Sequence, residues 1–546
     1  MKLKLFFLSL FFVNLLVAQD VPKNWHLLSP AEGYPGVSAE NLYKRLPKDV
    51  KPDTVIVAVI DGGVDYMHED LKNIMWKNPG EIPGNNIDDD KNGYVDDVYG
   101  WNFIGNAKGE NVHYDNLEVA RLYAKYKKRF DGVDPASLKK KEREEYNFYL
   151  KVKEETEDGR QQFKQNYDIY TVFSGAVDQI KEAFADKDSI TIEDLNQFKS
   201  NDPGMGRILQ VVMAQMNNGA TFEAFAADIK EGYSYFKERY EYNFNPDYNA
   251  RQFVDDNYAD KSERIYGNPD VKGPDAFHGT HVAGIIAAQR GNDVGMDGVA
   301  SVVKIMALRV VPGGDERDKD VANAIYYAVD NGATVINMSF GKGYSPYKKV
   351  VDDAVKYAAK KDVLLVHAAG NDGHEITDSN NFPTDKFAKK GLFGPKVAPN
   401  WVEVGAINWE GGEKIVAGFS NFSKEYVDVF APGTAIYSTT PENEYKNSQG
   451  TSMASPVVAG VAAVLRAYFP DLSAVQVKEI IETSSDKESM MVIKPGSEDK
   501  VPFNELSTSG GMVNLESAIE TAIKTTGKKK KAGKRKAIKL GKKPRA

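Results

Sequence analysis

Six apolar runs rich in β-branched residues recur along the chain and alternate with stretches of helical length. The runs lie at 55–60, 302–311, 333–340, 363–368, 401–407 and 426–430. Their hydrophobicity is continuous rather than alternating, which is typical of strands buried on both faces of a parallel sheet. Helical patterns cover 320–331, 347–361 and 452–469. We therefore predict an α/β fold with a doubly wound, mainly parallel sheet.

Residues 105–270 interrupt this alternation, because they are rich in Lys, Glu, Tyr and Phe and contain few β-branched runs. Helix starts are visible at Asp134-Pro135 and in the capping box that begins at Thr191. Four aromatic residues are expected to form one buried stripe: Tyr146, Phe163, Tyr167 and Phe173. We predict a large all-helical insertion at 105–270. The alternative, a disordered charged linker, fits the aromatic content poorly.

The first 19 residues have the pattern of a secretory signal peptide. Lys2 and Lys4 precede an apolar run that ends at Val17, and the small residue Ala18 follows. An uncleaved anchor is the alternative, although the run is short for a membrane span. No other stretch approaches 18 apolar residues, so no transmembrane segment is expected after cleavage. We expect a bacterial protein that is exported to the periplasm or the medium.

Charge and cysteine content narrow the chemistry. The 546 residues include 70 Lys and Arg, 78 Asp and Glu and no Cys, with a formal net charge of −8. Disulfides, thiolate zinc sites and a cysteine nucleophile are therefore excluded. Residues 524–546 hold 12 basic residues and no acidic one, which predicts a disordered basic tail. In an exported protein we expect this tail to adhere to anionic envelope polymers or to remain solvated, and no nucleic acid partner is expected.

Three segments carry residues that could act together in catalysis. Asp61 follows a buried strand in VAVIDGG, His278 opens HGTHVAGIIAA, and Ser452 begins a helix of small residues in GTSMASP. A serine hydroxyl needs a base to remove its proton, and an imidazole base needs a carboxylate to fix its tautomer. A helix N-terminus adds backbone N–H groups for a developing oxyanion. Asn371, which follows the run at 363–368, could donate to the same oxyanion.

In this order and with these flanks, the four residues resemble the subtilisin-like serine protease (subtilase) family over about 25–104 and 271–523. The resemblance implies a subtilisin-like fold and hydrolysis of peptide bonds in polypeptide substrates through an acyl-enzyme. It implies that Asp61 orients His278, that His278 is the general base and then acid, and that Ser452 is the nucleophile. Asn371 and the Ser452 N–H would form the oxyanion hole.

Some alternatives remain beside this assignment. His281 lies one helical turn after His278 and competes for the role of base. An inactive scaffold that uses the insertion for docking is a second alternative. A carboxyl peptidase with a Glu–Asp–Ser set is a third, but the intact HGTH sequence disfavours it.

The resemblance also implies a primary specificity pocket with two walls. We define the pocket walls as Ser339, Phe340 and Gly341 on one side and Ala368, Ala369 and Gly370 on the other. No acidic residue occurs in them, so we expect a large apolar side chain or an uncharged one before the cleaved bond. The peptidase domain then comprises 20–104 and 271–523, and a monomer is expected. Asp20–Thr54 is too short for the folded prodomain of many subtilases, so we hypothesise that the insertion restricts access or steadies folding instead.

An acidic loop at 85–97, NNIDDDKNGYVDD, predicts a structural Ca²⁺ site that would support an exported protein without disulfides. Side-chain oxygens of Asp88, Asp90 and Asn92 at positions 1, 3 and 5 before Gly93 match a calcium-loop spacing, but Tyr99 stands where a closing Glu is expected. The predicted ligands are Asp88, Asp90, Asn92, Asp96, Asp97 and the Tyr94 carbonyl. The alternative is an Asn/Asp-rich surface turn. A second, weaker site would join Asp70 to the loop at 289–295.

Overall fold

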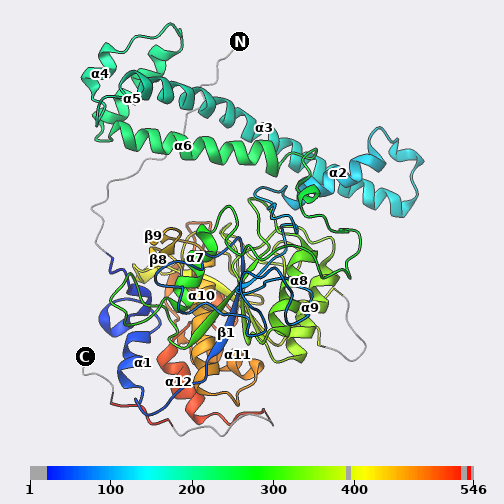
Figure 1. Cartoon of the computed structure of the whole chain (residues 1–546), viewed down its shortest axis with the longest axis vertical. Helices are drawn as coiled ribbons and strands as arrows, with labels where there is room; N and C mark the ends of the chain where they lie inside the picture. The colour runs from blue at the N-terminus through cyan, green and yellow to red at the C-terminus, as the bar shows by residue number, and fades with distance from the viewer. Residues whose placement is uncertain (1–20, 389–394, 530–537, 543–546) are drawn as a thin grey trace.

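The fold is built on a nine-stranded sheet with the order β10-β13-β7-β6-β5-β4-β1-β3-β2, in which only β10 runs antiparallel to its neighbour. The computed structural model describes residues 21–388, 395–529 and 538–542 (Figure 1), so the predicted signal peptide lies outside the described residues. The strands of the sheet are β1 Val55–Asp61, β2 Gly100–Asn102, β3 Val303–Arg309, β4 Val335–Met338, β5 Leu364–Ala368, β6 Trp401–Ile407, β7 Val429–Pro432, β10 Asp486–Lys487 and β13 Gly511–Met512.

Two small antiparallel pairs complete the strands. They are β8 Ile436–Thr440 with β9 Glu444–Ser448, and β11 Met491–Ile493 with β12 Lys500–Pro502. The prediction of a mainly parallel sheet is therefore confirmed. The last predicted strand begins late, at Val429, because the Asp428 carboxylate rather than a backbone carbonyl accepts the Glu403 N–H (2.8 Å).

Helices cover both faces of the sheet (Figure 1). One face carries α1 Ala39–Arg45, α7 Phe277–Ala287, α10 Thr451–Tyr468, α11 Ala474–Thr483 and α12 Leu515–Lys524, and the other carries α8 Asp318–Asp330 and α9 Lys348–Lys360. Successive residues of a strand point to opposite faces, so Val57 and Val59 enter the first core and Ala58 and Ile60 the second. Burial on both sides explains the continuous apolar runs.

The insertion is helical, as predicted, and projects from the α/β domain (Figure 1). Its helices are α2 Glu118–Phe130, α3 Lys140–Ala183, α4 Ile192–Gln197, α5 Met205–Asn217 and α6 Phe222–Glu238. The long helices α3 and α6 lie side by side, with α4 and α5 at one end and α2 at the other. Asp134 accepts the Ala136 N–H, and Thr191 forms the expected capping box with Asp194.

The prediction of one buried aromatic stripe is wrong. Tyr146, Phe163, Tyr167 and Phe173 are all only half-buried. The 44 residues of α3 extend about 66 Å at 1.5 Å per residue, which is too long to face a single core. Tyr146 packs with α2, Phe173 packs with α5 and α6, and the two middle rings contact aromatic residues near α6.

The two ends of the insertion meet at two successive places. Asn102 and Asn268 exchange backbone hydrogen bonds of 2.9 and 3.1 Å, and further out the Leu117 N–H donates to the Asn243 carbonyl (2.9 Å). Between these places the chain packs into the core beneath α8. Only the segment beyond the second place, which holds α2–α6, projects. We call the Leu117–Asn243 contact the neck.

The described part of the basic tail lies against the domain, in contrast to the free tail expected from composition. Ile538 is buried in the core that α1 and α12 share. Arg45 and Gly541 exchange two hydrogen bonds of 2.9 Å, and Lys529 forms an ion pair with Asp362 (2.6 Å). Within the described residues, none of the helices combines the length and the apolar character needed to cross a bilayer.

Candidate active site

Asp61 and His278 are joined in the structure. Asp61 is the last residue of β1 and is only 2% exposed, whereas His278 stands in the first turn of α7 with its side chain 42% exposed. The His278 Nδ1 lies 2.8 and 2.9 Å from the two Asp61 carboxylate oxygens. A carboxylate accepts hydrogen bonds, so it fixes the proton on Nδ1 and leaves the lone pair on Nε2.

The electrostatic surroundings of His278 favour its charged form. Burial lowers the pKa of the His278 imidazole, but the Asp61 charge and hydrogen bond, with a smaller contribution from Asp275, raise that pKa above its usual value. The competing His281 is fully buried, its Nε2 faces the Lys446 carbonyl at 3.0 Å, and burial lowers its pKa to about 4. His278 is therefore the histidine that is paired with the buried carboxylate.

Ser452 lies in the first turn of α10, after Gly450, whose φ of 145° favours glycine. Pro456 has no N–H to donate to the Ser452 carbonyl four residues earlier. The Ser339 hydroxyl donates to that carbonyl instead (2.9 Å), and the Ser452 hydroxyl donates to the Ser339 carbonyl (3.0 Å). These two bonds hold the serine against the end of β4.

The predicted wall residue Ser339 therefore has its side chain beneath α10, where it is buried and also bonds Ser455 and Asn337 (2.8 and 2.9 Å). Only its backbone is left to line a pocket. The sequence carries a signal for this role, because a proline four residues after Ser452 predicts a carbonyl that needs a donor from elsewhere.

The N-terminus of α10 also positions Asn371. Its Oδ1 accepts the Thr451 N–H (2.8 Å) and hydroxyl (3.0 Å), and the Thr451 hydroxyl in turn accepts the Gly370 N–H (3.0 Å). With Oδ1 held, Nδ2 is the end of the side chain that can donate. The N–H groups in the first turn of α10 lack intrahelical acceptors, so amide donors gather beside Ser452.

The other predicted wall residues lie at the ends of adjacent strands. Ala368 ends β5, and Ala369 and Gly370 follow it, the first two being buried. Phe340 is half-buried and Gly341 is exposed, just after β4. Since β4 and β5 are neighbours, the two predicted pocket walls lie side by side and end near Ser452 and Asn371.

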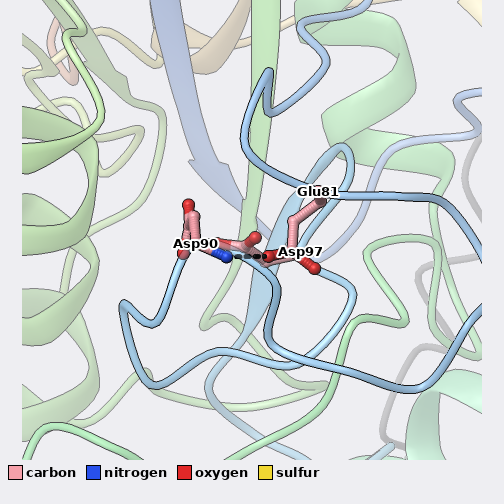
Figure 2. A group of neighbouring side chains, drawn as sticks. All are labelled: Glu81, Asp90 and Asp97. Carbon is pink, nitrogen blue, oxygen red and sulfur yellow. Dashed lines mark hydrogen bonds between the residues drawn. The ribbon is translucent and has the colours of Figure 1, made fainter.

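Three carboxylates converge near the predicted calcium loop. Figure 2 shows Glu81, Asp90 and Asp97, which each offer an oxygen within 4.8 Å of the others. We call this group the acidic ring. Burial, with a smaller contribution from Asp90, raises the pKa of Asp97 to about 6, although Tyr327 and two asparagines donate to it. Glu81 lies outside the loop pattern, and no spacing in the sequence marks it.

The remaining predicted calcium ligands serve the loop itself. Asp88 accepts the Asn92 and Gly93 N–H groups (3.0 and 2.9 Å), and Asp96 accepts two N–H groups at 84 and 86. The Asn92 amide donates to Asp90 and Asp97. The Tyr94 hydroxyl donates to the Arg264 carbonyl outside the loop, a bond that does not involve the predicted Tyr94 carbonyl. The structure thus brings two of the predicted ligands together with Glu81 and directs Asp88 and Asp96 to backbone groups.

At the second predicted site, Asp70 is fully buried and faces the loop at 289–295 as expected. Its carboxylate accepts from Asn292 Nδ2 (2.7 Å) and from the Met296 N–H (3.2 Å), and burial raises its pKa.

The insertion is tied to the segment beside the pocket walls by buried ions. Lys342, one residue beyond the first wall, contacts Glu118 (3.1 Å) and Asp318 (2.8 Å). Burial lowers the pKa of Lys342, but these carboxylates raise it well above its usual value, so the ammonium stays charged. Arg317 forms two hydrogen bonds of 2.7 and 2.8 Å with Asp115.

A serine hydroxyl beside amide donors, with an imidazole oriented by a buried carboxylate, can be activated against a carbonyl carbon. This combination on an α/β sheet is typical of serine hydrolases. The model described as the subtilase family matches residues 53–512. The chain therefore belongs to the subtilase family of peptidases.

Known relatives agree with this membership. The thermophilic serine proteinase of Bacillus sp. (strain AK1) is 39% identical over 211 residues, which is 38% of this chain and 47% of that protein. Subtilisin DY of Bacillus licheniformis is 37% identical over 38% of this chain and 70% of its own length. Thermitase of Thermoactinomyces vulgaris is 35% identical over 43% of this chain and 78% of its own length. The match thus spans less than half of the first of these relatives.

Among solved structures, a protease from Pseudoalteromonas arctica PAMC 21717 is 27% identical, with a TM-score of 0.37, over 47% of this chain and 78% of its own.

Proposed function

We propose that this protein is an endopeptidase that cleaves polypeptides through Asp61, His278, Ser452 and Asn371. The observation that carries the proposal is the hydrogen bond of His278 Nδ1 to both Asp61 oxygens. It leaves Nε2 as a base at the end of the sheet where α10 presents Ser452. The Ser452 hydroxyl leaves the Ser339 carbonyl and turns toward Nε2 when substrate enters, since catalytic hydrogen bonds often form only in the complex.

The reaction then follows from the geometry. The Ser452 oxygen attacks the peptide carbonyl carbon while His278 Nε2 takes the hydroxyl proton, and Asp61 stabilises the imidazolium. Asn371 Nδ2 and the Ser452 N–H donate to the oxyanion. His278 returns the proton to the leaving amine, which gives the acyl-enzyme. Water then attacks the acyl carbon while His278 takes its proton. His278 passes that proton to the departing Ser452 oxygen, which releases the acid.

A fluorophosphonate label tests this assignment, because it reacts with an activated serine hydroxyl. We expect labelling of the native protein and its loss in Ser452→Ala. Ser455→Ala is the matched control, since Ser455 lies one turn further along α10 and bonds Ser339. Labelling that persists in Ser452→Ala, or casein cleavage that survives it, would refute the assignment.

We also propose that the acidic ring binds a structural Ca²⁺ ion. Three carboxylate oxygens so close together repel one another, although the Asn92 amide donates to two of the three groups, and a cation among them would relieve that repulsion. Oxygen donors of this kind suit Ca²⁺. Bound calcium would fasten the loop at 81–97. At 100 times its Kd, a ligand specific to the folded state adds about 2.7 kcal/mol of stability.

Thermal unfolding with and without calcium tests the ring. We expect Glu81→Gln to reduce the calcium-dependent rise in Tm and Asp96→Asn to leave it unchanged, since Asp96 faces backbone N–H groups. The reverse order of effects would favour the ligand set expected from the sequence pattern.

The proposed cellular site is outside the cytoplasm, supported by the signal pattern of residues 1–19. Fractionation of a bacterial host, with N-terminal sequencing of the mature protein, tests export and cleavage beside Ala18. The basic tail would add electrostatic adhesion to anionic envelope polymers, which salt should weaken.

For the insertion we propose control of access to the cleft or support of the cleft edge. Tyr344, three residues beyond Gly341, bonds Glu155 of α3 (2.7 Å) and packs edge-on against Phe148. Removal of the projecting segment with a short linker at the neck tests both roles. Faster cleavage of folded proteins by this variant supports control of access to the cleft. Loss of peptide cleavage in a variant that still folds supports a role in holding the cleft edge.

A further inference from the structure

The position of the substrate follows from the proposed function, on which this inference rests. The residue before the cleaved bond must place its carbonyl carbon at Ser452 Oγ and its oxygen at Asn371 Nδ2. The chain leaves β4 beside the serine and leaves β5 just before the asparagine. Because these strands are neighbours, the substrate side chain enters between the two pocket walls.

Asn381 already stands between these walls. Its side chain belongs to the loop that follows Asn371, and the residue is 7% exposed. Its Nδ2 donates to the Ala369 carbonyl (3.2 Å) in one wall. On the other side, a Cβ added to Gly341 would lie 2.8 Å from the Asn381 Oδ1. One amide group therefore spans the space from wall to wall.

The surroundings hold Asn381 in this place. Its Nδ2 also donates to Glu403 Oε1 (3.2 Å), and Glu403 is itself fixed by His367 Nδ1 at 2.9 and 3.0 Å. The next residue, Phe382, exchanges two backbone hydrogen bonds of 2.9 Å with Lys342. The amide therefore cannot swing aside without breaking buried contacts.

We call the Asn381 amide the pocket floor. Its polarity determines which substrate side chains the pocket can accept. The Asn381 Nδ2 donates to Ala369 and to Glu403, whereas no donor to Oδ1 is found among residues 21–388, 395–529 and 538–542. The half-buried Phe340 adds an apolar surface beside it. A substrate side chain thus meets an apolar flank and a hydrogen-bond acceptor between the walls. Leaving such an acceptor against an apolar ring is unfavourable.

We propose that Asn381 closes the specificity pocket and makes this peptidase prefer an uncharged residue before the cleaved bond whose side chain is short to intermediate and ends in an N–H or O–H donor. Glutamine and threonine satisfy this description. Phenylalanine and tyrosine do not fit, because the amide lies in the space between the walls that an aromatic ring would need. This selectivity narrows the expectation from the wall sequences alone, which allowed a large apolar side chain or an uncharged one.

Peptide p-nitroanilides that differ only in the residue before the cleaved bond test the proposal. For the native enzyme we expect kcat/KM at least tenfold higher with glutamine than with phenylalanine. In Asn381→Gly, kcat/KM for phenylalanine should rise by about 10- to 100-fold, the range of discrimination by pocket shape. The value for glutamine should fall several-fold as the acceptor is lost.

Asn380→Gly is the matched control. Asn380 is the neighbouring, half-buried asparagine of the same loop, and its Nδ2 donates to the Glu375 carbonyl (3.0 Å). The same substitution there loosens the loop without touching the floor, so the preference should stay native. Asn381→Ser is a second variant, which retains a small polar side chain if glycine prevents folding.

Several results would overturn the inference. They are a native preference for phenylalanine, an unchanged preference in both Asn381 variants that fold, or an equal change in Asn380→Gly. A cleavage profile of a denatured protein mixture gives the same ratios if the nitroanilides are poor substrates. Absence of both fluorophosphonate labelling and cleavage would instead refute the proposed function, so the two failures are distinguishable.

Discussion

The position of Asn371 predicts a large loss of kcat when its amide donor is removed. Its Oδ1 is held by two hydrogen bonds from Thr451, at 2.8 and 3.0 Å, so Nδ2 is aimed before substrate arrives. Such a donor acts on the oxyanion far more than on the ground-state carbonyl. In Asn371→Ala we therefore expect kcat to fall by about 10²–10³, or about 2.7–4 kcal/mol, with KM changed little.

A matched substitution separates the donor from the packing. In Asn371→Asp the carboxylate can still accept both Thr451 bonds, so the loop keeps its support, but it places an acceptor and a negative charge where a donor is needed. We expect kcat at least as low as in Asn371→Ala. Thr451→Val removes the 3.0 Å bond to Asn371 and the bond from the Gly370 N–H but keeps the backbone donor, so about a tenfold loss is expected as Asn371 becomes less firmly held.

The assay is steady-state hydrolysis of one peptide substrate, with fluorophosphonate labelling and thermal unfolding on each variant. The reasoning is refuted if Asn371→Asp retains kcat within about threefold of native, or if the loss appears in KM alone. Equal losses in Thr451→Val and Asn371→Ala would show that the loop, and not the donor, had been disturbed.

Three further predictions follow from charges in the structure. Asp61 raises the pKa of His278, and the base must be neutral, so Asp61→Asn should move the acid limb of the kcat/KM profile to lower pH and reduce kcat by about 10⁴. An unshifted acid limb would contradict the pairing. Lys342→Met removes a buried ammonium between Glu118 and Asp318 and should cost about 3–5 kcal/mol, seen as a lower denaturation midpoint. Chelation of calcium should lower Tm and speed self-digestion in the native protein, and much less in Glu81→Gln.

The sheet could be predicted from the sequence, and the candidate catalytic residues could be proposed from it, because both leave local marks. Strands such as β1 are buried on both faces, so their apolar runs are continuous. The carboxyl ends of parallel strands meet at one edge, so Asp61 and Asn371 could be assigned to one site from separate segments. The glycine and threonine residues next to the candidate catalytic residues in the sequence are local marks of the same kind.

Other features of the site arise from tertiary contacts between residues whose sequence spacing carries no signal. Glu81 joins Asp90 and Asp97 only because the loop folds back, and its spacing matches no ligand pattern. Asn381 lies in a loop rich in Asn and Ser, where composition predicts a turn and not a pocket floor. The aromatic residues of α3 follow a helical period, but the period does not show that one long helix contacts several separate cores.

The neck between Leu117 and Asn243 makes the projecting helices a detour: the chain departs and returns at one point. Length added to such a detour raises the entropic cost of closing it only logarithmically. The register of the sheet does not depend on which segment is inserted there. The outer helices can therefore diverge, shrink or be exchanged for another helical module at small cost to folding. The contacts of Lys342 and Tyr344 are among those that a replacement would have to restore.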